Sequence, residues 1–583
     1  MASLDGLDLL FTKLGIGKWN YIFYTTSLLV PATQPGLLIG AEFMNPLPSF
    51  TCNLFDNGST TSYNGSECFM VEEGDVVPCT SWTYDTSVFQ STVSMEWDLV
   101  CERAPLGPLF QTIFTCGSLF GSILAALAAH RYGRRAAVRL GTACTLVGVV
   151  LLTVTPWFSL VLVLRFLLGV FNTIMVYPGF LLSIEICVPR MRPILGIVLA
   201  VPYAVTMIIL AGLAFSIREW RPLQAVVSLP ILFTLLPVLY LVDESPRWLV
   251  VNGRLDEALK VLQRASRLNS VSLPEPSELA IIVSTIYKRQ NKMTGKQTED
   301  GTLESTQISY IEKEKENQIS FVETKLGESV ERGREEGDSS SSSSSSSNNK
   351  LGVEDGIGSW WAGPVALVRT SCIRKRMVIL TLIWLMMSMV YLGLPLSSDA
   401  FSSPFLYMVL LGVIEMPAYT LTAPITQRLG RRLVICFCFT SCGFLLLSEF
   451  SLNLAHNHNE LIYFVLTLCS YLFICTAYQV NLLYASELLP TSIRPWGTAT
   501  CVLAGSLGFS ISPYITDYLT QHLQWLSSLL FGVCSVLCAV LVMLLPETNG
   551  LKLPETVADL SSTSAPPRSR EDVMATMTGT GRV

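Results

Sequence analysis

The sequence predicts an all-α membrane protein whose twelve transmembrane helices form two six-helix bundles related by a pseudo-two-fold axis. Half of the 583 residues are apolar and only 14% are charged. The mean hydropathy is +0.47, and this combination is unusual in a soluble protein of this size. Three short charged motifs each occur twice, at offsets of 297 to 303 residues. Such an internal repeat is typical of a membrane protein built from two similar halves.

Apolar stretches long enough to cross a bilayer, about 20 residues each, recur along both halves of the chain. Each stretch should be a helix, because lipid offers no hydrogen-bonding partner for open backbone groups. They lie near 19–41, 106–129, 136–156, 158–182, 194–216, 222–242, 377–396, 403–424, 433–452, 461–484, 496–518 and 525–545. We therefore expect an N-terminal bundle over 19–242, a long loop over 243–376 and a C-terminal bundle over 377–545.

The positions of the basic residues predict the orientation. Arginines follow the second, fourth, eighth and tenth apolar stretches, and the positive-inside rule places these loops in the cytoplasm. The N-terminus (1–18), the long loop and the tail (546–583) should lie on the same side. The first apolar stretch has full membrane length and lacks a small-residue cleavage site, so we expect no cleaved signal peptide. The expected location is the plasma membrane.

The loop over 42–104 is then the only sizeable extracellular segment. Cysteines in an oxidising compartment form disulfides more often than they remain free. We expect two disulfides, with three alternative pairings, among Cys52, Cys68, Cys79 and Cys101. Acceptor sequons for N-glycans begin at Asn57 and Asn64.

The long loop contains two kinds of sequence. Residues 254–267 have the apolar spacing of an amphipathic helix. Residues 293–355 are rich in Glu, Lys, Gly and Ser and include a serine run at 339–347, which is a composition typical of disorder. A tolerated linker and a segment for phosphorylation or trafficking are both compatible with it.

The repeated charged motifs predict a network that changes with conformation. A motif of arginine, any residue, glycine and two arginines recurs at 131–135 and 428–432, and glutamates close the fourth and tenth helices. One copy alone would be ordinary positive-inside charge. Two equivalent copies indicate arginine–carboxylate pairs that form in the outward-open state and break as the halves rock. The expected gating residues are Arg131, Arg134, Arg135, Glu185, Arg192, Glu244, Arg247, Arg428, Arg431, Arg432, Glu487, Arg494 and Glu547.

These motifs resemble those of the major facilitator superfamily, and more narrowly its organic ion transporter family. The resemblance rests on Gly-Ser at 117–118 with the motif at 131–135, Glu-Ser-Pro-Arg-Trp-Leu at 244–249, the run at 484–494 and Leu-Pro-Glu-Thr-Asn-Gly at 545–550. The resemblance to the organic ion transporter family in particular rests on Glu-Trp-Asp-Leu-Val-Cys at 96–101 and on the aromatic residues of 383–393. It covers residues from about 15 to 560 and implies the major facilitator fold, alternating access and transport of small organic ions.

Two positions depart from the family pattern. The residue before each basic motif is usually Asp, but here His130 and Gln427 occupy these positions. A histidine is mostly neutral at pH 7 and does not replace a carboxylate. Either other acids complete the gate, or this protein occupies its inward-open state more.

Two charges inside apolar helices are candidate functional groups, because a charge at mid-bilayer is costly. Arg165 is either a hydrogen-bond hub or a functional cation. Glu415 either attracts an ammonium group or forms an internal ion pair. Trp384 and Tyr391, seven residues apart, either bind a cation through their ring faces or face lipid. The expected substrate-binding residues are Glu415, Trp384, Tyr391, Ser506, Arg165 and Tyr203.

The resemblance implies Asp in cation transporters, and Arg in anion transporters, at the position of Ser506. A cavity without that charge suits zwitterions such as carnitine-like solutes, or weakly selected cations. We therefore expect a secondary-active or facilitative transporter of organic cations or zwitterions. An organic anion transporter of the same fold and a non-transporting receptor are the alternatives. Sequence leaves the oligomeric state open.

Enzymatic function has no support in the sequence. The chain lacks a Gly-x-x-x-x-Gly-Lys-Ser/Thr nucleotide loop and has no Ser/His/Asp set and no Cys/His cluster for a metal. We therefore expect no cofactor, no metal, no ATP and no nucleic acid. The expected partners are a small organic ion and the lipid bilayer.

Overall fold

Helices dominate the computed structural model, which describes residues 5–52, 62–63, 66–72, 75–188, 191, 195, 198–293, 371–455, 459–490, 493–520, 523 and 525–548. Eleven helical spans in this part of the chain are long and apolar enough to cross a membrane, and Val201–Ser216 is a shorter apolar helix. The predicted all-α membrane fold is confirmed. The chain divides into two compact units, which are described in turn: Tyr21–Asp243 with Trp360–Val583, and Met1–Asn20 with Glu244–Ser359.

The first half of the larger unit begins with a broken helix. It comprises α2 (Lys18–Ala32), α3 (Gln34–Leu38), α4 (Ala41–Met44), α6 (Leu109–Arg131), α7 (Arg134–Val154), α8 (Phe158–Ile186), α10 (Val201–Ser216), α11 (Trp220–Val227) and α12 (Leu229–Tyr240). The predicted window at 222–242 is interrupted at Ser228, which precedes a proline in the first turn of α12. Proline lacks a backbone donor, and it is tolerated at the first turn of a new helix.

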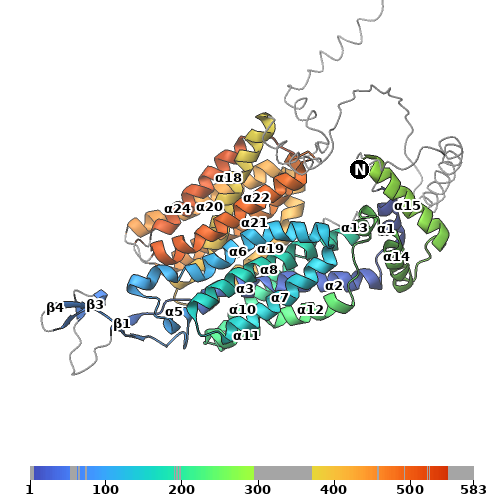
Figure 1. Ribbon diagram of the computed structural model, residues 1–583. Helices are drawn as coiled ribbons and strands as arrows, with labels where there is room; N and C mark the ends of the chain where they lie inside the picture. Colours follow the sequence, from blue (N-terminus) through green and yellow to red (C-terminus); the bar gives the residue numbers. More distant parts are fainter. Residues whose placement is uncertain are drawn as a thin grey trace, which may run out of the picture. The chain divides into compact units, whose positions relative to one another are not determined.

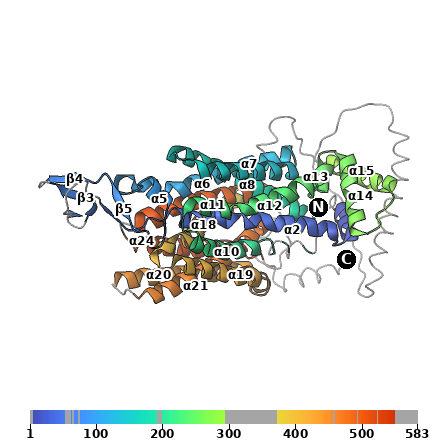
Figure 2. The same cartoon turned by 90° about the horizontal axis from the view of Figure 1, so that it is seen from below.

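The second half of this unit has fewer interruptions. It comprises α18 (Ser371–Gly393), α19 (Pro404–Leu429), α20 (Arg431–Leu454), α21 (Glu460–Leu488), α22 (Arg494–Pro513), a π-helical turn (Tyr514–Leu519) and α24 (Leu526–Met543). The helices of each half lie together (Figure 1), and α7 and α8 lie on the opposite side of the bundle from α20 and α21 (Figure 2).

Close helix pairs join the two halves. Helix α6 packs on α22, and α10 packs on α19. One hydrogen bond crosses between the halves here, from Thr112 Oγ1 on α6 to the backbone oxygen of Ser510 on α22 at 3.2 Å. Near the same end, Phe405 of α19 contacts three phenylalanines of the first half, at centroid distances of 5.5 to 5.8 Å: Phe43, Phe89 and Phe215.

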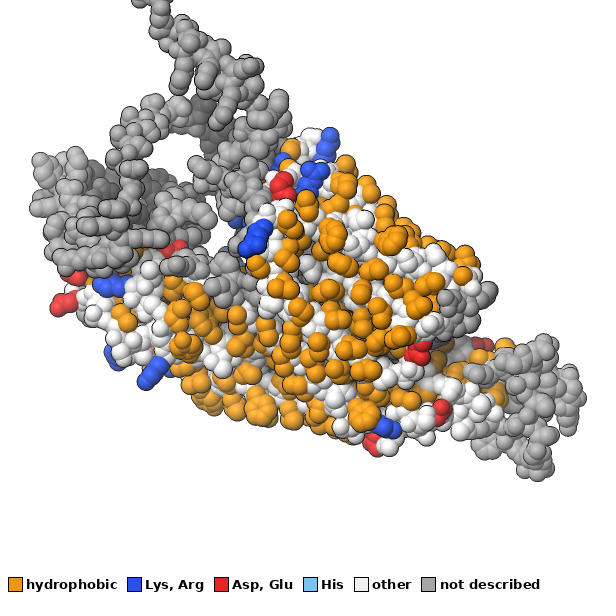
Figure 3. All heavy atoms as spheres, turned by 180° about the vertical axis from the view of Figure 1, so that it is seen from behind, with side chains coloured by type: hydrophobic (Ala, Val, Ile, Leu, Met, Phe, Trp, Pro, Cys, Tyr) orange, Lys and Arg blue, Asp and Glu red, His pale blue; other side chains and the backbone are white. Residues whose placement is uncertain are grey.

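The surface of the helices is apolar, as a lipid-facing surface should be. Large exposed apolar side chains include Val154 of α7 and Phe444 of α20, which are 69% and 70% exposed. Apolar side chains cover most of the visible helical face in Figure 3, and charged side chains gather toward its ends. This distribution is the one expected for helices that satisfy their backbone groups internally while their side chains meet lipid.

The segment between α4 and α6, which we call the inserted segment (residues 45–108), contains short antiparallel strands. Strand β1 (Phe50–Cys52) pairs with β5 (Trp82–Tyr84), and β2 (Ser62–Tyr63), β3 (Ser66–Glu72) and β4 (Asp75–Pro78) form a second sheet. A short helix α5 (Val93–Glu96) and a 3₁₀ turn (Cys101–Leu106) lead into α6. Of the three pairings left open by sequence, the structure contains Cys52–Cys79 and Cys68–Cys101. The sequons at Asn57 and Asn64 lie outside the described residues.

The smaller unit contains α1 (Asp5–Leu14), α13 (Pro246–Val251), α14 (Leu255–Asn269) and α15 (Pro276–Met293). Helix α14 occupies the stretch predicted to be amphipathic, and it buries Ala258, Leu262 and Ala265. Arg247 pairs with Asp8 of α1. The sequence analysis did not predict α1, although Leu7, Leu10, Phe11 and Leu14 have helical spacing and are buried. Residues 294–370, which include most of the segment predicted to be disordered, lie outside the described residues.

Candidate functional site

Glu415 on α19 is the centre of the candidate site. Its side chain is fully buried, and one carboxylate oxygen, Oε1, accepts three phenol hydroxyls. The donors are Tyr419 at 2.6 Å, Tyr391 at 2.7 Å and Tyr471 at 3.4 Å. The other oxygen, Oε2, has no hydrogen-bond partner among the described residues. The internal ion pair considered from sequence is therefore not formed within the described part of the chain.

Aromatic rings from α18 and α21 surround this carboxylate. Tyr391 stacks on Tyr478, with ring centroids 4.7 Å apart, and on Tyr471 at 6.0 Å. Trp384 meets Tyr478 nearly edge-on at 5.7 Å. Trp384 and Tyr391 are only 3% and 8% exposed, so both face the protein interior and not lipid.

The first half of the protein also contributes to this site. Tyr203 on α10 lies close enough to Tyr391 and Glu415 to interact with both. Because α10 packs on α19, the site lies where the two halves meet. A binding site at such an interface is typical of transporters built from two repeats.

Further buried polar atoms near the site have no hydrogen-bond partner among the described residues: Trp384 Nε1, Ser388 Oγ and Asn481 Oδ1. Ser388 follows Trp384 by one helical turn on α18, and the amide nitrogen of Asn481 contacts the sulfur of Met387 at 3.6 Å. Buried polar groups are normally paired. These atoms therefore have hydrogen-bonding capacity that no described residue uses.

Sequence reasoning missed the tyrosines that complete the site. Tyr419 follows Glu415 by four residues on the same helix, and Tyr471 and Tyr478 are seven residues apart on α21. These spacings place side chains on one helix face. The same criterion that selected Trp384 and Tyr391 would have selected the pair on α21.

Arg165 is the second buried charge, and the structure places it as a hydrogen-bond hub. Its Nη2 donates to Gln111 Oε1 at 2.9 Å, and its Nε and Nη1 donate to the backbone oxygens of Phe110 and Leu37 at 3.2 and 3.4 Å. The guanidinium also lies over the ring of Phe110, 4.0 Å from its centroid. These contacts join α3, α6 and α8 within the first half.

Ser506 on α22 has an internal partner. Its hydroxyl donates to the backbone oxygen of Val502, one turn earlier in the same helix, at 3.1 Å. Hydroxyls bonded in this way have less capacity to contact a ligand. The hydroxyl of Ser506 thus bonds within its own helix, and Ser506 itself is uncharged.

A cavity of about 550 Å³ lies near the inserted segment, between the two halves. Its lining includes the carboxylates of Glu42, Glu449, Glu460 and Asp517. Glu449 on α20 accepts hydrogen bonds from Ser528 and Thr467 at 3.1 and 3.3 Å. Sequence reasoning overlooked Glu449, although it lies within the predicted apolar stretch at 433–452.

Equivalent ion pairs connect helix ends in the two halves. Arg134, at the start of α7, pairs with Glu185, near the end of α8, at 2.9 Å. Arg431, at the start of α20, pairs with Glu487, near the end of α21, at 3.2 Å. The repeat read from the sequence therefore places the same chemical pair at the same location in each half.

Glu547 completes the cluster in the second half. Its carboxylate accepts the backbone N–H groups of Arg431 and Arg432, each at 3.0 Å, at the first turn of α20. Thr548 donates to Glu487 at 2.6 Å. Gly430 precedes this turn with a φ of +87°, a left-handed conformation that favours glycine. Gly133 has a similar φ of +98° in the first half.

The remaining predicted gating residues have other surroundings. Arg131 lies over the ring of Tyr132, Arg428 is exposed, and Arg135 and Arg494 donate to the backbone oxygens of Leu239 and Leu489. In the smaller unit, Arg247 pairs with Asp8, and Glu244 accepts the backbone N–H of Ser245. Arg192 and the side chain of Gln427 lie outside the described residues. His130 is exposed near the end of α6.

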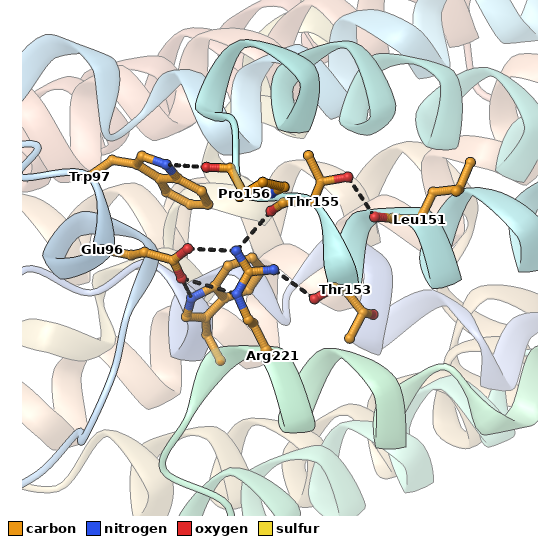
Figure 4. Close-up of polar contacts among 8 residues, drawn as sticks. Glu96, Trp97, Leu151, Thr153, Thr155, Pro156 and Arg221 are labelled. Carbon is orange, nitrogen blue, oxygen red and sulfur yellow. Dashed lines mark hydrogen bonds and ion pairs between the residues drawn. The ribbon is translucent and has the colours of Figure 1, made fainter.

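At the opposite end of the helices, Glu96 fastens the inserted segment to the first half (Figure 4). Its two oxygens accept from Arg221 at 2.5 Å and from the indole of Trp220 at 2.8 Å. Arg221 also donates to the backbone oxygen of Thr153 in the last turn of α7, at 2.6 Å, and to that of Thr155 just after the helix, at 2.8 Å. The indole of Trp97 donates to the backbone oxygen of Pro156 at 3.2 Å. The Glu-Trp motif at 96–97 thus has a structural role.

Comparison with known proteins gives consistent matches over most of the chain. Residues 84–306 and 369–559 match a family described as "Sugar (and other) transporter". Steroid transmembrane transporter SLC22A24 of Homo sapiens is 27% identical over 495 residues, covering 84% of this chain and 77% of that protein. Solute carrier family 22 member 3 of Rattus norvegicus is 29% identical over 549 residues, covering 93% and 83%. Solute carrier family 22 member 2 of Homo sapiens is 26% identical over 502 residues, covering 85% and 76%.

A solved structure supports the same fold. The inward-open xylose transporter XylE from E. coli superposes with a TM-score of 0.58 at 14% identity, covering 93% of this chain and 98% of that one.

Proposed function

Because the chain belongs to the sugar (and other) transporter family of membrane proteins, we propose that it carries small organic cations or zwitterions through an alternating-access cycle. The resemblance to organic ion transporters of the major facilitator superfamily, stated from sequence, is confirmed. The protein is a multi-pass membrane transporter of organic ions and not an enzyme. The class of solute is the part that we propose.

The free oxygen of Glu415 is the observation that carries the proposal. Three tyrosines donate to Oε1, so the carboxylate has a fixed orientation while Oε2 has no hydrogen-bond partner among the residues that the structure describes. A buried carboxylate without a counter-charge is costly, and a cationic solute would remove that cost. The ring faces around it would also attract an ammonium group.

The surroundings of the two buried charges favour a cation over an anion. The groups near Glu415 are phenols, whereas Arg165 is already occupied by Gln111 and by backbone oxygens. A solute anion would therefore compete with these partners for Arg165. Trp384, Ser388 and Asn481 supply uncharged hydrogen-bonding groups, which support the zwitterion alternative because they would bind its polar end.

A steroid is a second candidate solute. SLC22A24, one of the relatives, is named a steroid transmembrane transporter. The aromatic rings of Trp384, Tyr391 and Tyr478 would also pack against a flat apolar ring system. A neutral steroid would not need Glu415, so a mutation at this position separates the two candidates.

We place both termini and the paired arginine motifs in the cytoplasm of a plasma-membrane protein, with the inserted segment and its sequons at Asn57 and Asn64 outside. The ion pairs Arg134–Glu185 and Arg431–Glu487 would then hold the cytoplasmic helix ends in one conformation. Their equivalence in the two halves supports a role in setting the conformational equilibrium.

Uptake in oocytes tests the proposal. Labelled tetraethylammonium, carnitine, para-aminohippurate and a steroid are offered to wild-type protein, Glu415→Gln and Glu257→Gln. Glu257 is the control, because it is an exposed carboxylate of the smaller unit that pairs with Arg254 and lines neither the cavity nor the tyrosine cluster. We expect cation or carnitine uptake to fall more than tenfold in Glu415→Gln and to stay within about twofold in Glu257→Gln, tenfold being about 1.4 kcal/mol. Uptake of para-aminohippurate alone would overturn the charge argument.

A further inference from the structure

We propose that Glu415 binds either a proton or the solute cation, so that the protein exchanges one cation for one proton. This inference rests on the proposed function and names its coupling ion. It does not follow from the family assignment, since it depends on what surrounds this one carboxylate.

The described residues that interact with Glu415 are uncharged when they carry their own protons. They come from α10, α18, α19 and α21, and are Tyr203, Tyr391, Tyr419, Tyr471 and Cys475. None of the hydrogen bonds or ion pairs formed by Glu415 in the described part of the chain involves Lys, Arg or His. Within the described residues, the carboxyl group therefore has no bonded cation that neutralises it.

Burial makes the ionised form of Glu415 costly when no counter-charge is bonded to it. Glu415 is 0% exposed, and an ionised carboxylate in such surroundings is strongly disfavoured. The three phenols offset part of this cost, but all of them donate to Oε1. When no solute is bound, burial shifts the equilibrium toward the neutral carboxylic acid. The proton belongs on Oε2, because the three donors already occupy Oε1.

The exchange follows from this arrangement. When an organic cation enters from one side, the O–H bond at Oε2 breaks, the proton leaves to water on that side, and the carboxylate pairs with the cation. After the halves rock, the cation leaves on the other side and Oε2 takes a proton from water there. Both forms that cross, acid and ion pair, are neutral. The ionised empty form is the one that burial opposes, so one cation moves in one direction for each proton in the other.

Arg165 does not take part in this exchange. Its partners are Gln111 and two backbone oxygens, and an arginine keeps its charge through such a cycle. It therefore contributes the same charge to every state of this exchange.

Proteoliposomes with the membrane potential clamped at zero test the coupling. We expect an acidic lumen to accelerate tetraethylammonium uptake several-fold over symmetric pH. We also expect the lumen to lose one proton per tetraethylammonium taken up, with no net current. Glu257→Gln, at an exposed carboxylate of the smaller unit, should keep this coupling. Uptake that ignores the pH gradient and carries one charge per molecule would overturn the exchange while leaving the proposed function standing. Absence of any organic cation uptake would overturn both.

Infrared difference spectroscopy on the purified protein tests protonation without transport. Addition of tetraethylammonium should remove the carbonyl band of one protonated carboxylic acid, and this loss should be missing in Glu415→Gln and retained in Glu257→Gln. A solute that binds without changing this band would show that Glu415 was already ionised, which contradicts the exchange.

Discussion

The hydroxyl of Tyr391 on α18 and the Oε1 atom of Glu415 on α19 are joined by a hydrogen bond of 2.7 Å, although the residues lie 24 positions apart. Tyr391 also stacks on Tyr478 of α21. One tyrosine thus orients the carboxylate through its hydroxyl and forms an aromatic wall through its ring. These two roles are separable by mutation.

We expect Tyr391→Phe to raise the KM for tetraethylammonium roughly tenfold with little change in maximal rate. The mutation keeps the ring but removes one donor to a charged group, which contributes about 1.5 kcal/mol. Tyr478→Phe is the matched control, since Tyr478 stacks on Tyr391 and is not a donor to Glu415. Unchanged uptake kinetics in both mutants would show that only the rings matter.

Arg165→Lys should destabilise the protein by about 2–4 kcal/mol, because each buried acceptor left unpaired costs about 1–3 kcal/mol. A lysine has no planar fork to reach Gln111 and the two backbone oxygens together. Thermal unfolding in detergent, followed by size-exclusion chromatography, measures the effect. Arg218→Lys should be nearly neutral, because this half-buried arginine donates to Ser87 at the surface. A stable Arg165→Lys protein would exclude the hub role.

Exchanging the two charges of the ion pair in the second half should show whether the pairing itself, or the residue type at each position, is required for uptake. We expect Arg431→Glu and Glu487→Arg each to lower uptake several-fold, and the double mutant to recover most of it, because the pair is re-formed with opposite polarity. Arg254 and Glu257 form an exposed pair, whose reversal should change little. No recovery in the double mutant would mean that the surrounding contacts, and not the pair, set the uptake rate.

Glu547→Ala should loosen the first turn of α20. The mutation removes the acceptor for the N–H groups of Arg431 and Arg432, and the loss of such a cap costs about 1 kcal/mol. Hydrogen exchange at these amides should accelerate about fivefold by that estimate. Thr548→Ala leaves the cap intact and serves as control. Unchanged exchange would show that the cap is dispensable.

Non-reducing peptide mapping should recover only two cross-linked pairs from the inserted segment, Cys52 with Cys79 and Cys68 with Cys101. The pairs interleave along the chain, so the second encloses part of the loop closed by the first. Recovery of a peptide that joins Cys52 to Cys68 would contradict the structure. Full-length protein from mammalian membranes is the appropriate material.

Sequence predicted the helical fold because membrane length and hydropathy are local properties of the chain. The repeated motif also selected Arg134, Glu185, Arg431 and Glu487 as members of a network of arginine–carboxylate pairs, but it did not specify which arginine pairs with which carboxylate. Sequence did not predict α1, whose 10 residues are too few for a membrane-length search.

The details of the site required three-dimensional information. Whether Glu415 meets Tyr471 depends on how α19 packs on α21, and no local pattern encodes that packing. Ser506 was selected because of its aligned position, but its hydroxyl is bonded to Val502 of its own helix. A sequence can indicate which side chains are candidates for a site, but only the three-dimensional structure shows which groups they contact.

The contact around Phe405 differs in kind from the ion pairs at the opposite helix ends. Phe43, Phe89 and Phe215 meet it through rings alone, so parting them exposes apolar surface without leaving a charge or donor unsatisfied. Separating Arg134 from Glu185 or Arg431 from Glu487 instead breaks charged contacts, which dissolved salt screens. Higher ionic strength should therefore make opening easier at the end that contains the ion pairs. Opening at the end that contains Phe405 should depend instead on the hydration of the rings. The salt concentration alone should thus bias which end opens more readily.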